Sequence, residues 1–150
     1  TKLTQHYGID TEAAWSPDGR NIVFTSNRSG SPQLYQIPVT GGTPTRLTFE
    51  GSYNAAASVS PMGDTVAMVH GTGNGYQIAI QNLAGNIFRI LTEGTLDEAP
   101  SFAPNGSMII YSTRYRNSTV LSAVSADGRV KQRLRLQEGK VREPVWSPFR

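Results

Sequence analysis

Eleven side chains that could bind another molecule fall in four short segments of this sequence. They are Tyr7, Asp10, Thr11, Glu12, Tyr53, Asn54, Leu96, Asp97, Glu98, Arg142 and Glu143. Acidic and aromatic groups gathered on one surface suit an inserted loop or peptide with basic and polar groups, because aromatic anchors and complementary charge give an interface its specificity. The sequence therefore predicts a binding site for a polypeptide partner.

Two roles are open for the acids in this set. Glu12, Glu98 and Glu143 stand at similar places in their segments, and a structural role, such as accepting backbone N–H groups, suits them as well as partner contact does. The favoured contact residues are those expected nearer the loop tips: Asp10, Thr11, Tyr53, Asn54 and Asp97. Charge reversal at Asp97 is then expected to weaken partner binding without unfolding the protein.

Patterns typical of catalytic and cofactor sites are missing from the sequence. It has no Gly-x-Ser-x-Gly elbow, no phosphate-binding loop, no dinucleotide fingerprint and no cysteine. His6 and His70 lie in different kinds of segment and lack the partners that a zinc site or a catalytic triad needs. We therefore expect no enzyme activity and no cofactor, with a cation such as Ca²⁺ at the clustered acids as the one alternative.

Charge and composition narrow the choice of partner. The chain is 37% hydrophobic and 17% charged, with a formal net charge of +3, and no apolar run is long enough to span a membrane. The densest basic stretch, 129–135, alternates Arg and Lys with other residues, so on a strand these cations share one face. We interpret it as a solvated outer face and not a nucleic-acid site, because no aromatic residues interleave as a stacking platform.

Three sequence features recur along the chain at one interval. Leu-Thr occurs at 3–4, 47–48 and 91–92, and a small residue followed by proline occurs at 16–17, 60–61, 103–104 and 147–148. A large apolar residue precedes each of those proline pairs: Trp15, Val59, Phe102 and Trp146. The shared interval of 43 or 44 residues is an internal repeat. The two tryptophans and Phe102 are expected to be packing residues.

Each repeat is predicted to form four short strands separated by turns. The expected strands are 12–16, 21–26, 33–37 and 45–48 in the first repeat, 65–70, 76–81 and 88–92 in the second, and 107–113, 120–124 and 130–134 in the third. Pro-x-Gly turns and hairpin turns at 41–42, 85–86 and 127–128 separate them. The second strand is apolar at consecutive positions, which indicates that both of its faces are covered.

Four antiparallel strands at this period are typical of a β-propeller blade. A single sandwich is the alternative, but it requires no fixed period. We expect an all-β, partial β-propeller over 1–150, with repeats at about 5–48, 49–92 and 93–136 and the first strand of a closing blade in 137–150. Single strands at both ends would leave apolar faces open, so we expect a piece of a longer ring, with assembly of two copies as the alternative.

The eleven candidate residues fall in the expected connections from one fourth strand to the next first strand. These connections are 5–12, 49–55, 93–98 and 137–143. The first strand of a propeller blade lines the central channel, so these connections are expected to form an acid-rich rim around its mouth.

The repeat unit resembles the PD40 class of WD40-like propeller repeats, on Trp-Ser-Pro-Asp-Gly at 15–19 and Phe-Ala-Pro-Asn-Gly at 102–106. The whole chain resembles the TolB family more closely, on residues 11–18, 24–26, 41–44, 50–52, 96–101, 103–106, 125–129 and 146–149. A departure is Val59, where the second repeat lacks the aromatic residue.

The resemblance implies a periplasmic protein of a Gram-negative bacterium and the C-terminal half of a six-bladed ring. It further implies membership of the Tol–Pal system, which supports outer-membrane integrity and cell division, and binding of the peptidoglycan-associated lipoprotein Pal. Colicin translocation segments would use the same surface. Contact with TolA would need an N-terminal region outside this sequence.

A second function stays open at this point. Related repeats occur in the substrate-gating propellers of prolyl oligopeptidases and tricorn-like peptidases. Such a protein would continue into a hydrolase domain with a serine elbow, so the sequence flanking this segment distinguishes the two.

Overall fold

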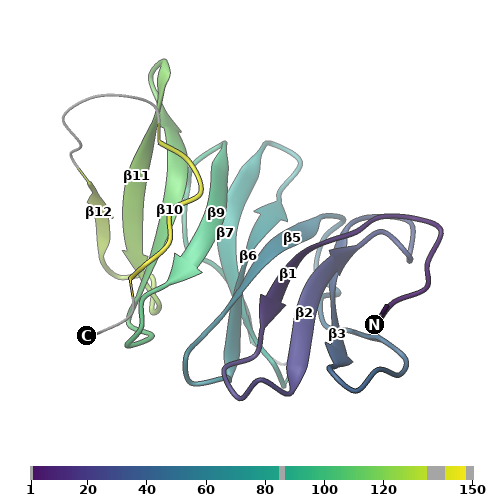
Figure 1. Cartoon of the computed structure of the whole chain (residues 1–150). Coiled ribbons are helices and arrows are strands. Elements are labelled where there is room, and N and C mark those ends of the chain that lie inside the picture. Colours follow the sequence, from purple (N-terminus) through teal and green to yellow (C-terminus); the bar gives the residue numbers. More distant parts are fainter. Residues whose placement is uncertain (1, 85–86, 135–140, 148–150) are drawn as a thin grey trace.

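The computed structural model describes residues 2–84, 87–134 and 141–147, which form three four-stranded antiparallel sheets (Figure 1). The first sheet holds β1 (Asp10–Trp15), β2 (Asn21–Ser26), β3 (Gln33–Pro38) and β4 (Thr45–Arg46). The second holds β5 (Asn54–Val59), β6 (Thr65–Gly71), β7 (Tyr76–Asn82) and β8 (Phe88–Ile90). The third holds β9 (Asp97–Phe102), β10 (Met108–Tyr115), β11 (Ser118–Ser125) and β12 (Lys131–Arg133). Within each sheet, strands that are consecutive in sequence are neighbours.

The turn after each first strand is built by its own side chains. In the first sheet, Ser16 Oγ donates to Asp18, while Gly19 N–H donates to the Ser16 carbonyl at 2.9 Å with a left-handed φ of 68°. Glycine adopts that backbone without the steric cost of a Cβ. The predicted second strand 21–26 is confirmed by β2. The expected turn at 85–86 lies outside the described residues.

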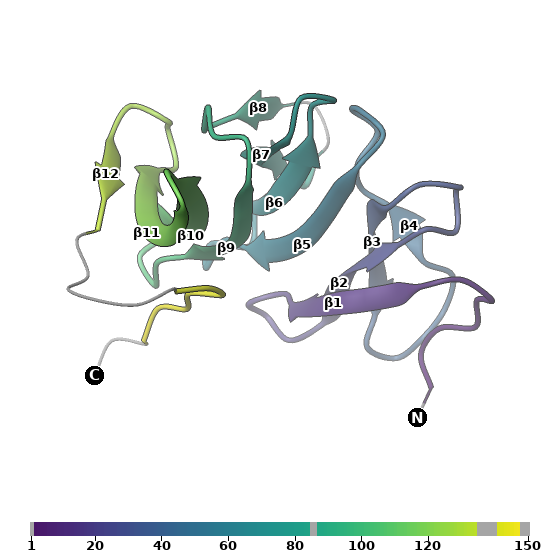
Figure 2. The same cartoon turned by 90° about the horizontal axis from the view of Figure 1, so that it is seen from above.

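The sheets are arranged like blades around a common concave side. Figure 2 shows β1, β5 and β9 along that side and β4, β8 and β12 at the outer edge. Alternate residues of β6 point to opposite faces and so pack against the two neighbouring sheets. Val66 and Met68 pack with Val23 and Leu34 of the first sheet. The expectation that both faces of a second strand are covered is confirmed for β6.

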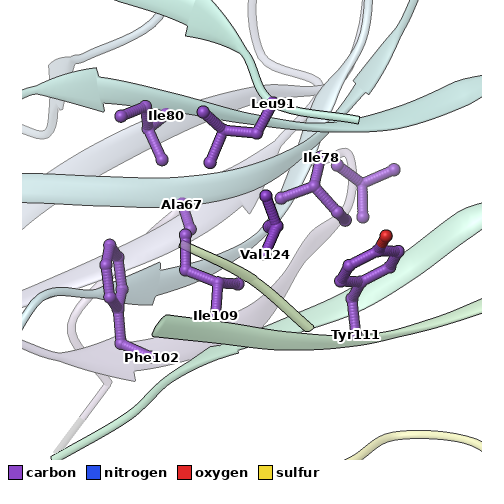
Figure 3. Close-up of a cluster of buried hydrophobic side chains, with 9 residues drawn as sticks. Ala67, Ile78, Ile80, Leu91, Phe102, Ile109, Tyr111 and Val124 are labelled. Atoms are coloured by element: carbon purple, nitrogen blue, oxygen red, sulfur yellow. The ribbon is translucent and has the colours of Figure 1, made fainter. Parts of the chain in front are cut away.

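The other face of β6 belongs to a second core. Ala67 and Val69 pack against Ile109 and Tyr111 of β10, and Phe102 of β9 closes the cluster (Figure 3). Apolar side chains that are buried between sheets hold neighbouring blades together through the hydrophobic effect.

Each inner strand contains a β-bulge at the same repeat position. The register with the second strand shifts within 11–14 of β1 and 55–58 of β5, and again between β9 and β10. Glu12, Ala56 and Ala99 adopt left-handed φ values of 53°, 54° and 52°, and Glu143 follows at the same spacing with 51°. A bulge re-aims the side chains of a strand, and here it does so along the concave side.

Two expectations about strands need correction. The first strands begin earlier than predicted, so Asp10, Thr11, Glu12, Asp97 and Glu98 lie on β1 or β9 and not in loops. Residues 2–4 and 141–147 form no strand, because no other described segment pairs with them; 135–140 and 148–150 lie outside the described residues. None of the described residues forms a helix that could cross a membrane.

The repeated large apolar residues do not share one environment. Phe102 is buried, as expected, but 65% of Trp15 is exposed at the concave side. Trp146 is partly exposed, and its indole N–H donates to the Ser101 carbonyl of β9 at 2.9 Å. The packing prediction is therefore wrong for Trp15, because no other sheet among the described residues covers its ring.

Candidate binding groove

The concave side carries a groove of about 1020 Å³. Its walls come from all three inner strands and from the segment after the third sheet: 12–15, 55–59, 98–101 and 142–145, with Tyr53, Val69, Tyr76 and Ser112. We call this the inner groove. Three alanines of β5, 55–57, are among the residues that line it, and their short side chains take up little of its volume.

Five of the eleven predicted residues line the inner groove, and six do not. The five are Glu12, Tyr53, Glu98, Arg142 and Glu143. The six away from its walls are Tyr7, Asp10, Thr11, Asn54, Leu96 and Asp97. Glu12, Glu98 and Glu143, for which a structural role was an equal alternative, thus line the groove. Of the five favoured contact residues, only Tyr53 does.

Asn54 and Asp97 were expected near loop tips, and that placement is wrong. Asn54 is fully buried and Asp97 is 1% exposed. Together with Asp10 they occupy one repeat position, where the inner strand pairs with Ser26, His70 or Thr113 of its neighbour. The three side chains have different hydrogen-bond partners, but each belongs to a sheet and not to the rim.

Asn54 is the centre of a polar network between the first two sheets. Its amide N–H group donates to Gln33 Oε1 at 2.9 Å and to the Glu50 carbonyl at 2.8 Å, and its Oδ1 is 2.8 Å from His70 Nδ1. Thr48 donates to the same Gln33 oxygen at 2.7 Å. Buried polar groups are retained when their hydrogen bonds are satisfied, so Asn54 fixes the connection before β5.

Asp97 accepts a hydrogen bond from the Thr113 hydroxyl on one oxygen. Its other oxygen is buried and has no hydrogen-bond partner among the described residues. A larger residue at Gly94 would meet this carboxylate, because a Cβ there would lie 2.0 Å from Asp97 Oδ1. Charge reversal at Asp97 would bury an unpaired ammonium, so the expectation that it leaves the fold intact conflicts with the structure.

Asp10 is neutralised within its own sheet. Arg28 donates to both of its carboxylate oxygens at 3.0 Å, and the guanidinium lies 5.2 Å and 4.9 Å from the ring centroids of Phe24 and Tyr35. Burial raises the pKa of Asp10, but hydrogen bonds from Ser26, Thr4 and Arg28 and the Arg28 charge outweigh it and lower the pKa overall. This carboxylate stays ionised but is not free to bind a partner.

Glu12 has a structural role as well as a place in the groove. Its Oε2 accepts hydrogen bonds at 2.9 Å from the Thr25 hydroxyl and from the backbone N–H of Ala56, which is the equivalent residue in the second sheet. One carboxylate thus connects the first two inner strands at their bulges.

Tyr76, which sequence reasoning missed, faces the inner groove beside Tyr53. Their ring centroids are 5.0 Å apart with planes tilted by 60°. Tyr76 begins β7, after the hairpin from β6, and strands alternate in direction. The hairpins between second and third strands therefore open at the same end as the connections that lead into first strands. The alternation of strand direction could therefore have indicated from the sequence that Tyr76 lies at the groove.

The groove is acidic and its charged groups are largely unpaired. Three carboxylates, Glu12, Glu98 and Glu143, and one guanidinium, Arg142, give its lining a net charge of −2. Within the described part of the chain, none of these four groups forms an ion pair within 4.0 Å. The described residues also contain no group of three or more metal-binding side chains placed to hold an ion.

Stacked four-stranded antiparallel sheets whose first strands surround a concave groove define a β-propeller. The profile of the TolB β-propeller domain matches residues 1–150, and this chain belongs to that family.

Relatives and solved structures agree. The Tol-Pal system protein TolB of Xanthomonas campestris is 54% identical over 117 residues, which are 77% of this chain and 27% of that protein. The chain therefore spans about a quarter of the length of the curated relatives it matches. A crystal structure of TolB from Acinetobacter baumannii is similar with a TM-score of 0.91 and 47% identity, over 99% of this chain and 38% of that one. A puromycin-hydrolysing peptidase of Mycobacterium tuberculosis shares the fold alone, at 17% identity and a TM-score of 0.72, over 87% of this chain and 22% of that one.

Proposed function

We propose that the inner groove is a non-catalytic binding site for a loop of the lipoprotein Pal, in the periplasm of a Gram-negative bacterium. The protein would thereby support outer-membrane integrity and cell division. The main support is the groove itself, whose lining combines a net charge of −2 with two tyrosines and three consecutive alanines. Colicin translocation segments would compete for the same groove.

The geometry favours an inserted segment over a flat interface. The walls come from three separate sheets and leave about 1020 Å³ between them. Pocketed, aromatic-lined surfaces of this kind supply the anchoring contacts of protein interfaces. The unpaired carboxylates would attract basic groups on the partner and raise its association rate at low salt.

Filling the groove tests this function. Ala13 is exposed on β1 and lines the groove, so Ala13→Trp adds bulk there. We expect calorimetry with the periplasmic domain of Pal to show at least a tenfold loss of affinity. The matched control is Ala84→Trp, an exposed alanine in the turn after β7, which should leave affinity unchanged. Equal affinities for both variants would place Pal elsewhere on the molecule.

A further inference from the structure

The middle blade presents two tyrosines to the inner groove, and close backbone approaches hold both. Gly71 N–H donates to the Tyr53 carbonyl at 2.9 Å, and a Cβ on Gly71 would lie 2.9 Å from the Tyr53 Cβ. Tyr76 N–H donates to the Thr95 carbonyl at 3.0 Å, and a Cβ on Gly75 would lie 2.3 Å from that oxygen. Because glycines permit these contacts, the ring pair is positioned by the backbone and not by its own packing alone.

Each neighbouring blade adds a carboxylate to the groove that this ring pair lines. Glu12 comes from β1 and Glu98 from β9, and both line the groove with the two tyrosines. Burial raises the pKa of Tyr53, and the charges of Glu12, of Tyr76 and of Glu98 raise it further, so both carboxylates act on the Tyr53 hydroxyl. We call Tyr53, Tyr76, Glu12 and Glu98 together the acidic corner of the groove. This corner has two aromatic rings and two negative charges.

The Glu98 carboxylate is the open part of this corner. Glu98 is exposed, and its side chain has no hydrogen bond or ion pair within the described ranges. Glu12 uses one oxygen for Thr25 and Ala56 and keeps the other. Arg142 shares the groove but lies more than 4.0 Å from both carboxylates, so the protein does not neutralise the corner itself.

The chemistry of this corner selects one class of ligand. Tyrosine faces attract cations, and the attraction is strongest where water is partly excluded. An anion would be repelled by the two carboxylates, and an apolar side chain would leave them without a partner. We propose that Tyr53, Tyr76, Glu12 and Glu98 form a subsite for one lysine or arginine side chain of the segment that enters the inner groove.

This subsite rests on the proposed function, since it names the chemistry of one residue of the bound segment. In the intact protein, Glu98→Gln should weaken binding of the Pal periplasmic domain about tenfold, and the loss should shrink as salt is raised. Tyr76→Leu should weaken it similarly, whereas Tyr76→Phe keeps the ring face and should retain most of the affinity. Asp64→Asn is the control for charge, because Asp64 is an exposed acid in the turn between β5 and β6, outside the groove.

A small probe separates this proposal from the function on which it rests. N-acetyl-arginine amide should shift the NMR signals of the Tyr53 and Tyr76 rings, and N-acetyl-norleucine amide should not. If Ala13→Trp blocks Pal but Glu98→Gln leaves affinity unchanged and the arginine probe shifts neither ring, the cationic subsite is wrong and groove binding stands. If the arginine probe shifts both rings in a Glu98-dependent way while Ala13→Trp leaves Pal affinity intact, the subsite stands and the assigned partner is wrong.

Discussion

Single residues on the inner strands carry backbone strain that the repeat places on the concave side. Ala56 and Ala99 adopt left-handed φ values of 54° and 52° without a glycine's freedom. An L-residue there costs about 1–2 kcal/mol. The strain is offset by the bulge it creates, which turns groove residues inward and offers Ala56 N–H to Glu12.

Ala99→Gly is expected to stabilise the protein. Removing the Cβ relieves the left-handed strain of about 1–2 kcal/mol. The greater freedom of the unfolded chain offsets about 0.4–1 kcal/mol of that gain, so the free energy of unfolding should rise by about 0.5–1 kcal/mol. Urea denaturation measures it. The control is Ala13→Gly, at an exposed inner-strand position without positive φ, which should lower the free energy of unfolding by about 0.5–1 kcal/mol. A similar decrease for Ala99→Gly would show that the Ala99 backbone is unstrained.

Asp97→Lys is expected to destabilise the third sheet severely. The carboxylate is 1% exposed, so the new ammonium would be buried without a partner, at a cost of about 3–5 kcal/mol. Asp97→Asn should cost much less, because Asn54 occupies the equivalent position and an amide oxygen can still accept from Thr113. Thermal unfolding by circular dichroism compares them, and equal melting temperatures for the wild type and the lysine variant would contradict this account.

At the scale of elements, the network between the first two sheets ties β5 to β6 and to β3. Asn54 pairs with His70 across the strands and reaches Gln33 in the neighbouring blade. The His70 ring also packs edge-on against Phe88 at 4.9 Å between centroids. The position of the rim before β5 therefore depends on the His70 imidazole.

Acidification should weaken this element. Burial lowers the pKa of His70 below its ordinary value of 6.5, although the Glu50 charge partly opposes the shift. The unfolded chain then binds the proton more readily, so the stability from His70 is complete above pH 6.5 and is lost as pH falls through the folded-state pKa. Urea midpoints measured from pH 8 to about pH 5 should fall more steeply for the wild type than for His70→Gln. Parallel curves would mean that His70 is protonated without cost.

At the scale of the whole molecule, stability comes from blade-on-blade packing. The middle sheet has an apolar core on each face, and side-chain hydrogen bonds of Glu12, Asn54, Gln81 and Ser58 add specific contacts between blades. In stacked repeats of this kind, the interface between neighbours carries much of the folding energy.

Ile109→Ala should loosen the third blade from the second. Ile109 is fully buried in the core that joins them, and removing its branched side chain costs about 2–5 kcal/mol. Hydrogen exchange should show amides of β9 to β12 losing protection before those of β2 and β3. Val130→Ala, more than half exposed, should change stability by less than about 0.5 kcal/mol. Uniform loss of protection in all three sheets would instead indicate one cooperative unit.

The sequence alone predicts the blades, because turn chemistry, strand periodicity and the repeat interval are local properties. It predicted β2 to the residue and placed Glu12, Tyr53, Glu98, Arg142 and Glu143 at the groove. The tertiary structure fixes which polar residues are buried, since the partners of Asn54 and Asp97 come from other strands. It also brought Tyr76 to the groove, because a wall made by three sheets exists only once the sheets are stacked.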